Sequence, residues 1–281
     1  MTISATDFYS AADGTMTPEV EAAFYRTLKM RNSTFKTTHY GRFDDINPAL
    51  AKTVGGRIPP DPQILDLAVS TGVSTVELAN ALRSAGMVPQ ITATDLYIEG
   101  RIFDLGGGMR VLADRLGWPL QYDVRGLAIR PWIRRLDYVT LAFLPRQAVR
   151  AALVPKLRAM AQSAAGEWVS LVSRKLADDP AVRLIEDDLF VRNSEFVGRF
   201  DLIRAANILN SGYFTNDVLL GGIGNIRSYL RGSGSLLLVT RTADADNRNA
   251  ATLFELAPNG KFRVVDRFAE GSEIEALVLG S

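Results

Sequence analysis

The stretch ILDLAVSTGVSTVELANAL, residues 64–82, decides the fold. Its first six residues form a short apolar run that is typical of a buried strand, and the residues STVELANAL have the apolar spacing of a helix. The turn between them holds a single glycine, Gly72, where nucleotide-binding turns carry two or three. The stretch therefore predicts a strand, a tight turn and a helix, and it leaves open whether the turn holds a nucleotide-like ligand.

Similar apolar runs recur along the chain and alternate with helical patterns. QITATDLY (90–97) predicts a second strand that ends in an acid, and NDVLLGGIGNIRSYLRG (216–232) predicts a helix. The other predicted strands are VRLIEDDLF (182–190), FDLIRAANIL (200–209), GSLLLVTRT (234–242), KFRVVDRFA (261–269) and SEIEALVLG (272–280). Alternating strands and helices indicate an α/β fold with a parallel sheet, and we expect the last two strands to close it as an antiparallel pair.

The remaining segments predict two additions to this core. We expect residues 1–60 to form an N-terminal helical or lid segment, because TPEVEAAFYRTLKMR (17–31) has helical spacing with Thr17 as the N-cap and Pro18 at the first helical position. The core is expected over residues 61–281, with an insertion over 97–181 between strands two and three. Within the insertion, MRVLADRLGWPLQYDV (109–124) predicts two strands, and RQAVRAALVPKLRAMAQSA (146–164) predicts a helix interrupted at Pro155. This inserted cap is where we expect substrate specificity to be encoded.

Composition excludes several kinds of chemistry. The 281 residues include no cysteine, so disulfides, thiolate nucleophiles and Cys-ligated metals are excluded, and the single histidine, His39, cannot form a multi-histidine site. We therefore expect no metal. Lys plus Arg (32) balances Asp plus Glu (31), which argues against a nucleic-acid partner. The first residues lack a signal-peptide pattern and no long apolar run occurs, so we expect a cytoplasmic protein without a membrane segment.

The end of the second strand suggests how the turn could hold a ligand. Asp95 follows Gly72 at about the 20-residue separation at which an acid accepts hydrogen bonds from ribose hydroxyls. Side chains at Ala68 and Ser70 would crowd a pyrophosphate, which argues against NAD or FAD. A nucleoside without phosphates needs less room.

The turn and its partners resemble the ordered motifs of the class I S-adenosylmethionine-dependent methyltransferases. The first motif of that family reads hydrophobic-hydrophobic-Asp-hydrophobic-Gly-x-Gly-[Thr/Ser]-Gly, and the matching positions here are Ile64, Leu65, Asp66, Leu67, Thr71 and Gly72. TATDLY is similar to the second motif, IEDDLF to the third, FDLIRAANIL to the fourth and LRGSGSLLLVTRT to the entry of strand five. The resemblance covers residues 62–241 and implies a Rossmann-like seven-stranded, mostly parallel sheet with helices on both faces.

The resemblance also implies a set of residues that bind S-adenosylmethionine. They are Asp66, Ala68, Ser70, Thr71 and Gly72 in the turn, Asp95 and Leu96 after strand two, Asp188 and Leu189 beside the adenine, and Arg204 at the end of strand four. Ala68 and Ser70 stand where the family has glycine. Either the pocket tolerates them, with Ser70 donating a hydroxyl hydrogen bond, or they mark a pocket that no longer catalyses.

Catalytic candidates lie at the end of strand four and in the N-terminal segment. Asn207 and Tyr213 follow strand four, and His39 is the one side chain with an ordinary pKa near neutrality. FDLGGGMRVL (103–112) looks like a second glycine-rich motif, but no long apolar strand precedes it, so we interpret Gly106–Gly108 as a turn into the inserted hairpin.

The resemblance implies an S-adenosylmethionine-dependent methyltransferase, and we expect its acceptor to be a small molecule, with a homodimer left open. Without cysteine, cytosine C5 methylation through a covalent adduct is excluded. Two alternatives remain: an enzyme that transfers or cyclises the aminobutyrate arm of S-adenosylmethionine, and a methyltransferase-like binding protein without turnover. A nucleotide-dependent oxidoreductase is disfavoured by Ala68 and Ser70.

Overall fold

The computed structural model describes residues 2–12, 14–37, 40–163, 165–243 and 248–281. The chain divides into two compact units, and each is made of two separate stretches of sequence. One contains residues 1–39 and 97–173, and the other contains residues 40–96 and 174–281. Residues 40–60, which we grouped with the N-terminal segment, therefore lie in the same unit as the predicted first strand. We call the first the insert unit and the second the sheet unit.

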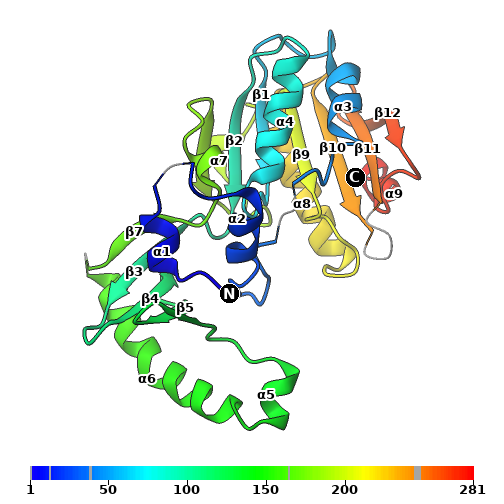
Figure 1. Cartoon of the computed structure of the whole chain (residues 1–281). Coiled ribbons are helices and arrows are strands. Elements are labelled where there is room, and N and C mark those ends of the chain that lie inside the picture. Colours follow the sequence, from blue (N-terminus) through cyan, green and yellow to red (C-terminus); the bar gives the residue numbers. More distant parts are fainter. Residues whose placement is uncertain (1, 13, 38–39, 164, 244–247) are drawn as a thin grey trace. The chain divides into compact units, whose positions relative to one another are not determined.

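The sheet unit contains a mixed seven-stranded sheet in the order β12-β11-β10-β9-β1-β2-β8 (Figure 1). The strands from β10 to β8 pair in parallel, whereas β11 pairs antiparallel with both β10 and β12. This confirms the predicted α/β fold with a mostly parallel sheet. The strands are β1 (Gln63–Leu67), β2 (Gln90–Asp95), β8 (Val182–Glu186), β9 (Leu202–Ala206), β10 (Leu236–Thr242), β11 (Asn249–Leu256) and β12 (Phe262–Phe268).

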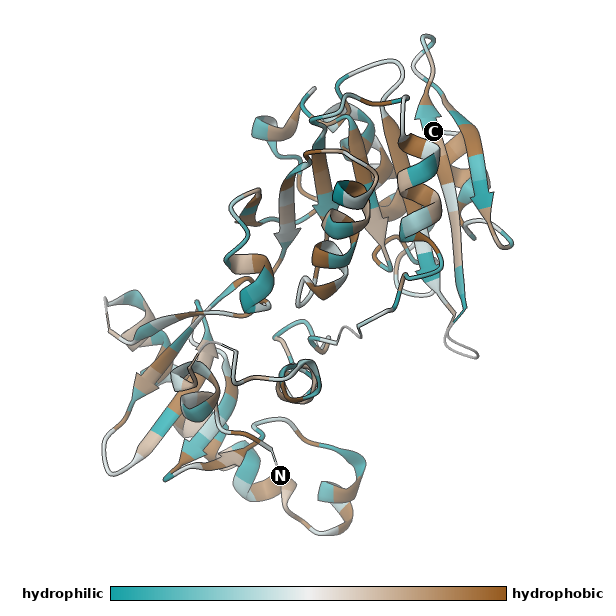
Figure 2. Cartoon of the chain, turned by 45° about the horizontal axis from the view of Figure 1, so that its top comes forward, coloured by the Kyte–Doolittle hydropathy of each residue, from teal (hydrophilic) through white to brown (hydrophobic). Residues whose placement is uncertain are grey.

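Helices cover both faces of this sheet. Side chains alternate between the two faces along each strand, so one strand contacts helices on both sides. Leu65 and Leu67 of β1 pack in an apolar core with α8, while Asp66 faces α4 and bonds Thr75 there. Figure 2 shows the strands as largely hydrophobic and the helices as mixed, as expected for a buried sheet between amphipathic helices. The helices are α3 (Asn47–Val54), α4 (Val73–Ser84), α7 (Arg174–Ala177), α8 (Asn216–Tyr229), α9 (Glu275–Leu279) and a short 3-10 turn, η1 (Ser194–Phe196).

The strand predicted over residues 261–269 is β12, but it pairs with β11, so its expected antiparallel pairing with residues 272–280 is wrong. Residues 272–280 do not form a strand. They contain helix α9 (Glu275–Leu279), whose N-cap residue Ile274 and helical residue Val278 are both buried in the same core as α8. The strand next to β10 is instead β11, which is buried along most of its length and which the sequence analysis missed.

The insert unit contains a five-stranded antiparallel sheet in the order β6-β5-β4-β3-β7. The N-terminal helices pack on it through Phe8 and Phe24, whose rings stack at 3.9 Å, and α2 starts at Pro18 after the Thr17 cap as predicted. The predicted hairpin is confirmed, and Gly106–Gly108 form the turn between β3 and β4. The elements are α1 (Ala5–Ser10), α2 (Pro18–Tyr25), β3 (Glu99–Asp104), β4 (Met109–Asp114), β5 (Pro119–Val124), β6 (Leu127–Ile129), α5 (Arg135–Val139), α6 (Phe143–Gln162) and β7 (Glu167–Ser170).

Helix α6 is continuous through Pro155, so the predicted interruption is wrong.

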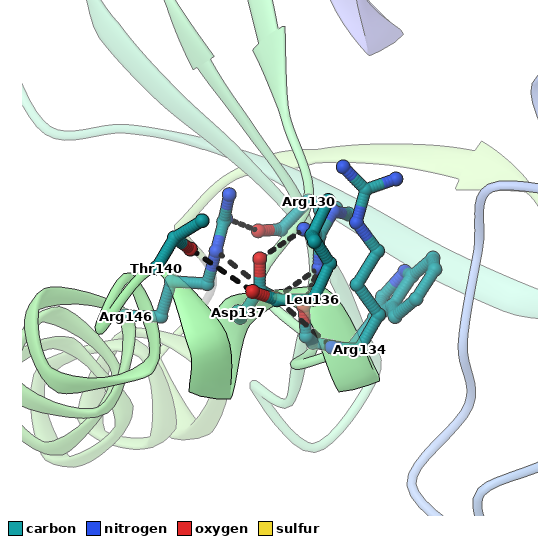
Figure 3. A network of polar contacts seen from close by, with 7 residues as sticks. Arg130, Arg134, Leu136, Asp137, Thr140 and Arg146 are labelled. Atoms are coloured by element: carbon teal, nitrogen blue, oxygen red, sulfur yellow. Dashed lines mark hydrogen bonds and ion pairs between the residues drawn. The ribbon is translucent and has the colours of Figure 1, made fainter.

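The short helix α5, which precedes α6, is held by a buried carboxylate (Figure 3). Asp137 accepts hydrogen bonds from both terminal nitrogens of Arg130 at 2.7 and 2.6 Å and from the Arg134 amide at 2.9 Å. The bonded Arg130 guanidinium holds the pKa of Asp137 well below its ordinary value. No helix in the described part of the chain combines the length and the apolar character needed to cross a membrane.

Candidate active site

The candidate site lies where the parallel strands of the sheet unit end. From β1, the chain continues to β2 and β8 on one side and to β9 and β10 on the other. Ligands of open α/β sheets bind outside the carboxyl ends of the strands at such a reversal of strand order. The loop from β1 to α4 and the segments after β2, β8 and β9 all meet at this edge, which is where the predicted ligand-binding residues were expected.

The backbone of the β1–α4 loop is left-handed at alternate residues. The φ angles are 55° at Ala68, 57° at Ser70 and 75° at Gly72. Glycine adopts this conformation readily, whereas for a residue with a Cβ atom the left-handed conformation is less favourable by about 1–2 kcal/mol. The loop therefore has left-handed backbone at all three positions where the resembled motif has glycine, although two of them hold Ala and Ser.

Hydrogen bonds tie this loop to the end of β2. Asp95 Oδ2 accepts from the Ser70 amide at 2.8 Å, and the Thr94 carbonyl accepts from the Val69 amide at 2.9 Å. Leu96, the next residue after Asp95, is 44% exposed. Helix α4 begins after Gly72, so the positive end of its dipole lies at the same edge. No side chain caps this end of the helix.

Thr71 and Gly72 turn inward rather than toward solvent. Thr71 is buried, and its hydroxyl has no hydrogen-bond partner among the described residues. A Cβ atom on Gly72 would lie 2.1 Å from Cδ2 of Leu176 in α7. Gly72 is therefore required both by its left-handed backbone and by the close packing of α7 on the loop.

Asp66 and Arg204 form a buried ion pair with each other. Arg204 donates from Nε to Asp66 Oδ1 at 2.8 Å and from Nη2 to Oδ2 at 2.6 Å, and both side chains are 1% exposed. Asp66 Oδ2 also accepts from the Thr75 hydroxyl at 2.7 Å. These contacts hold both side chains between the sheet and α4. The pair therefore supports the β1–α4 loop from the buried side.

Two acids follow β8. Asp188 Oδ1 accepts from the Phe190 amide at 3.0 Å, while Leu189 is buried in the core. The Asp187 amide donates to the Asp95 carbonyl at 3.1 Å, which places this turn beside the end of β2. Burial raises the pKa of Asp187, and the neighbouring Asp188 raises it further. Asp187 is not among the predicted site residues, although its position next to Asp188 in the sequence was a usable signal.

The segment after β9 contains one more strained residue. Asn207 has a φ of 60°, and its side chain bonds Thr242 at the end of β10, accepting from the amide at 2.7 Å and donating to the hydroxyl at 3.3 Å. Tyr213 is 79% exposed. Between them, Asn210 Oδ1 accepts from Arg241 at 3.0 Å, and Arg241 also pairs with Glu273.

Residues 41–45 link helix α4 to the start of β11, and nothing in the sequence indicated these contacts. The Gly41 amide donates to Glu77 of α4 at 2.6 Å, and the ring of Phe43 lies 5.7 Å from the Arg204 guanidinium. At the other end, Asn249 donates to Asp45 at 2.8 Å. His39, predicted as a base, lies outside the described residues.

Comparisons with known proteins find no matching family model and no match among curated proteins. Solved structures do show a likeness. The CurJ carbon methyltransferase has a TM-score of 0.37 at 15% identity, over 73% of this chain and 37% of that one. NodS from Bradyrhizobium japonicum WM9, an N-methyltransferase in complex with S-adenosyl-L-homocysteine, has a TM-score of 0.35 at 13% identity, over 74% and 66%.

A third likeness is to CalS10 from Micromonospora echinaspora, an amino pentose methyltransferase with S-adenosylmethionine bound. It has a TM-score of 0.36 at 12% identity, over 90% of this chain and 75% of that one. All three are described as methyltransferases. These TM-scores lie below 0.5 and the identities below 25%, so the likeness by itself assigns no function to this chain.

Proposed function

We propose that this protein is an S-adenosylmethionine-dependent methyltransferase whose acceptor is a small molecule. The observation that carries the proposal is the β1–α4 loop, left-handed at residues 68, 70 and 72 and hydrogen-bonded to Asp95 at the reversal of strand order. Backbone strain of this kind persists where the surrounding structure holds it, and it is common at ligand sites.

The residues at this edge suit a nucleoside with a charged amino-acid arm. A carboxylate at the end of β2 is suited to accept hydrogen bonds from ribose hydroxyls, as Asp95 would here. The uncapped start of α4 favours a negative group, which the methionine carboxylate provides. We assign Leu96, which follows Asp95 and is 44% exposed, to the contact with the adenine ring, because Leu189 is buried in the core.

Methyl transfer makes modest chemical demands on the protein. The bond from the methyl carbon to sulfur breaks as the bond to the acceptor forms, S-adenosylhomocysteine leaves, and the acceptor releases a proton where it carries one. Catalysis is then mainly alignment and exclusion of water. We assign Asn207 to shaping the edge near the reacting groups, since its bonds to Thr242 fix the end of β9 against β10.

Incubation with S-adenosylmethionine carrying a tritiated methyl group and an extract of small metabolites tests this function. We expect label in the small-molecule fraction together with S-adenosylhomocysteine. The variant Asp95→Ala should lower both at a limiting donor concentration, and Asp61→Ala, which removes an exposed acid just before β1, should leave them unchanged.

Other products would identify the alternatives. Methylthioadenosine in place of S-adenosylhomocysteine would show transfer of the aminobutyrate arm. Tight binding of S-adenosylmethionine without any product, across extracts of different sources, would make the protein a binding module. Failure to bind the donor would contradict all three.

A further inference from the structure

We infer that the buried Asp66–Arg204 pair is a positioning device that holds the β1–α4 loop in its strained, ligand-ready conformation. The inference deepens the proposed function and rests on it for the identity of the ligand. The geometry of the pair and of the loop is independent of that identity.

The pair holds both ends of the loop at once. Asp66 lies in β1 just before the left-handed residues, and Thr75 lies in the first turn of α4 just after them. Because one oxygen, Asp66 Oδ2, accepts from both Arg204 and Thr75, a single carboxylate joins the two ends. Arg204 also reaches the Ser74 hydroxyl at 3.4 Å.

Arg204 fixes this carboxylate from a rigid element. It lies in β9, directly opposite Asp66 in the parallel register, and the ring of Phe43 lies near its guanidinium. Two parallel hydrogen bonds between guanidinium and carboxylate fix orientation as well as distance. The front of the loop is held separately, by the bond from the Ser70 amide to Asp95.

A positioning role explains why a charged pair occupies this place. A buried ion pair adds little stability compared with apolar side chains of similar volume, because both charges lose their hydration. An apolar pair could fill the same space, but it could not accept a hydrogen bond from the Thr75 hydroxyl. It would therefore not fix the distance between the end of β1 and the start of α4. Ala68 and Ser70 lack the freedom of glycine, so the loop needs that external constraint.

The test is hydrogen exchange on the ligand-free protein carrying Asp66→Leu and Arg204→Met together. Replacing both partners avoids an unpaired buried charge, so we expect the double variant to fold with a melting temperature near that of the parent. The Ser70 amide should exchange at least about tenfold faster, equivalent to ~1.4 kcal/mol of lost protection, while the amides of β9 and β10 keep their protection. Binding of S-adenosylhomocysteine should weaken by a similar factor.

Glycine should replace part of what the pair does. Adding Ala68→Gly and Ser70→Gly to the double variant is expected to recover part of the affinity, because glycine adopts the left-handed backbone without strain. The control is Arg263→Met, which removes an exposed ion pair to Glu255 in the same sheet and should change neither exchange nor binding.

Two results would overturn the inference. One is an unchanged exchange rate at Ser70 in the double variant, and the other is faster exchange spread evenly over the sheet, which a merely structural role predicts. If the double variant does not fold, Thr75→Val removes only the bond between α4 and Asp66 and should accelerate the loop amides alone, while Thr75→Ser should restore them. Unchanged loop exchange in Thr75→Val would then count against the inference. Since exchange is measured without ligand, a parent protein that fails to bind S-adenosylhomocysteine would reject the proposed function and leave this result decisive by itself.

Discussion

At the scale of single residues, the candidate site is defined by two residues, Ala68 and Ser70, that replace glycines of a glycine-rich turn. Ala68 and Ser70 have left-handed backbone like Gly72, which sequence alone could not show because both residues usually avoid it. Asp95 could be predicted from its position at the end of an apolar strand. The partner of Asp66 could not, since Arg204 is 138 residues away and only the strand register brings the two together.

Glu77 gives a prediction about pH at this scale. It is half-buried and accepts from the Gly41 amide, and burial raises its pKa above the ordinary value of 4.5. A carboxyl with a raised folded pKa favours folding when protonated, so its contribution is fully present below about pH 4 and is lost as the pH rises through the folded pKa. The ionised form therefore opposes folding at neutral pH.

The variant Glu77→Gln should accordingly unfold at higher urea concentration than the parent at pH 7, and at nearly the same concentration at pH 4. Its amide oxygen can still accept from Gly41. Glu19→Gln is the matched control, because the Thr17 hydroxyl lowers the pKa of the exposed Glu19 carboxyl and no gain is expected. A loss of stability in Glu77→Gln at pH 7 would contradict the assignment.

At the scale of elements, the sequence predicted the parallel strands well because each is a short, continuous apolar run between turn residues. It failed where periodicity was ambiguous. Residues 272–280 contain too few residues to separate an alternating pattern from a helical one, and packing of Ile274 and Val278 decides for helix α9. Pro155 does not end α6, because the tertiary contacts of Leu153, Leu157 and Met160 in the insert unit hold the helix on both sides of it.

Packing of α7 on the β1–α4 loop gives the prediction for this scale. Gly72→Ala should lower the free energy of unfolding by about 3 kcal/mol, because the new methyl group overlaps Leu176 and the backbone is left-handed. Leu176→Ala removes the overlap, so the double variant should lose less than the sum of the single variants, by about 1–3 kcal/mol. Gly86→Ala, at a left-handed glycine with open space around it, measures the backbone effect alone. Additive losses would show that Leu176 is not what constrains Gly72.

At the scale of the whole molecule, the chain is two units built from interleaved stretches of sequence. The insert unit has its own core around Phe8 and Phe24, and the sheet unit has its own core under α8. We therefore expect calorimetry to resolve two unfolding transitions.

The two transitions should respond to different changes. Tyr25→Phe removes a buried hydroxyl that donates to the Val172 carbonyl at 2.6 Å inside the insert unit, so it should lower one transition only. S-adenosylhomocysteine should raise the other, since a ligand stabilises the unit that binds it. A single transition that both changes shift would show that the two units unfold together.

The central claim is that the edge formed by the β1–α4 loop and Asp95 binds the nucleoside of S-adenosylmethionine. Titration calorimetry with S-adenosylhomocysteine on the parent, Asp95→Ala and Asp61→Ala tests it most directly. We predict that the parent and Asp61→Ala bind alike, and that Asp95→Ala binds about 10- to 100-fold more weakly, as expected for the loss of hydrogen bonds to a carboxylate. Equal affinity in Asp95→Ala, or a parent protein that binds NADH and ignores S-adenosylhomocysteine, would contradict the claim.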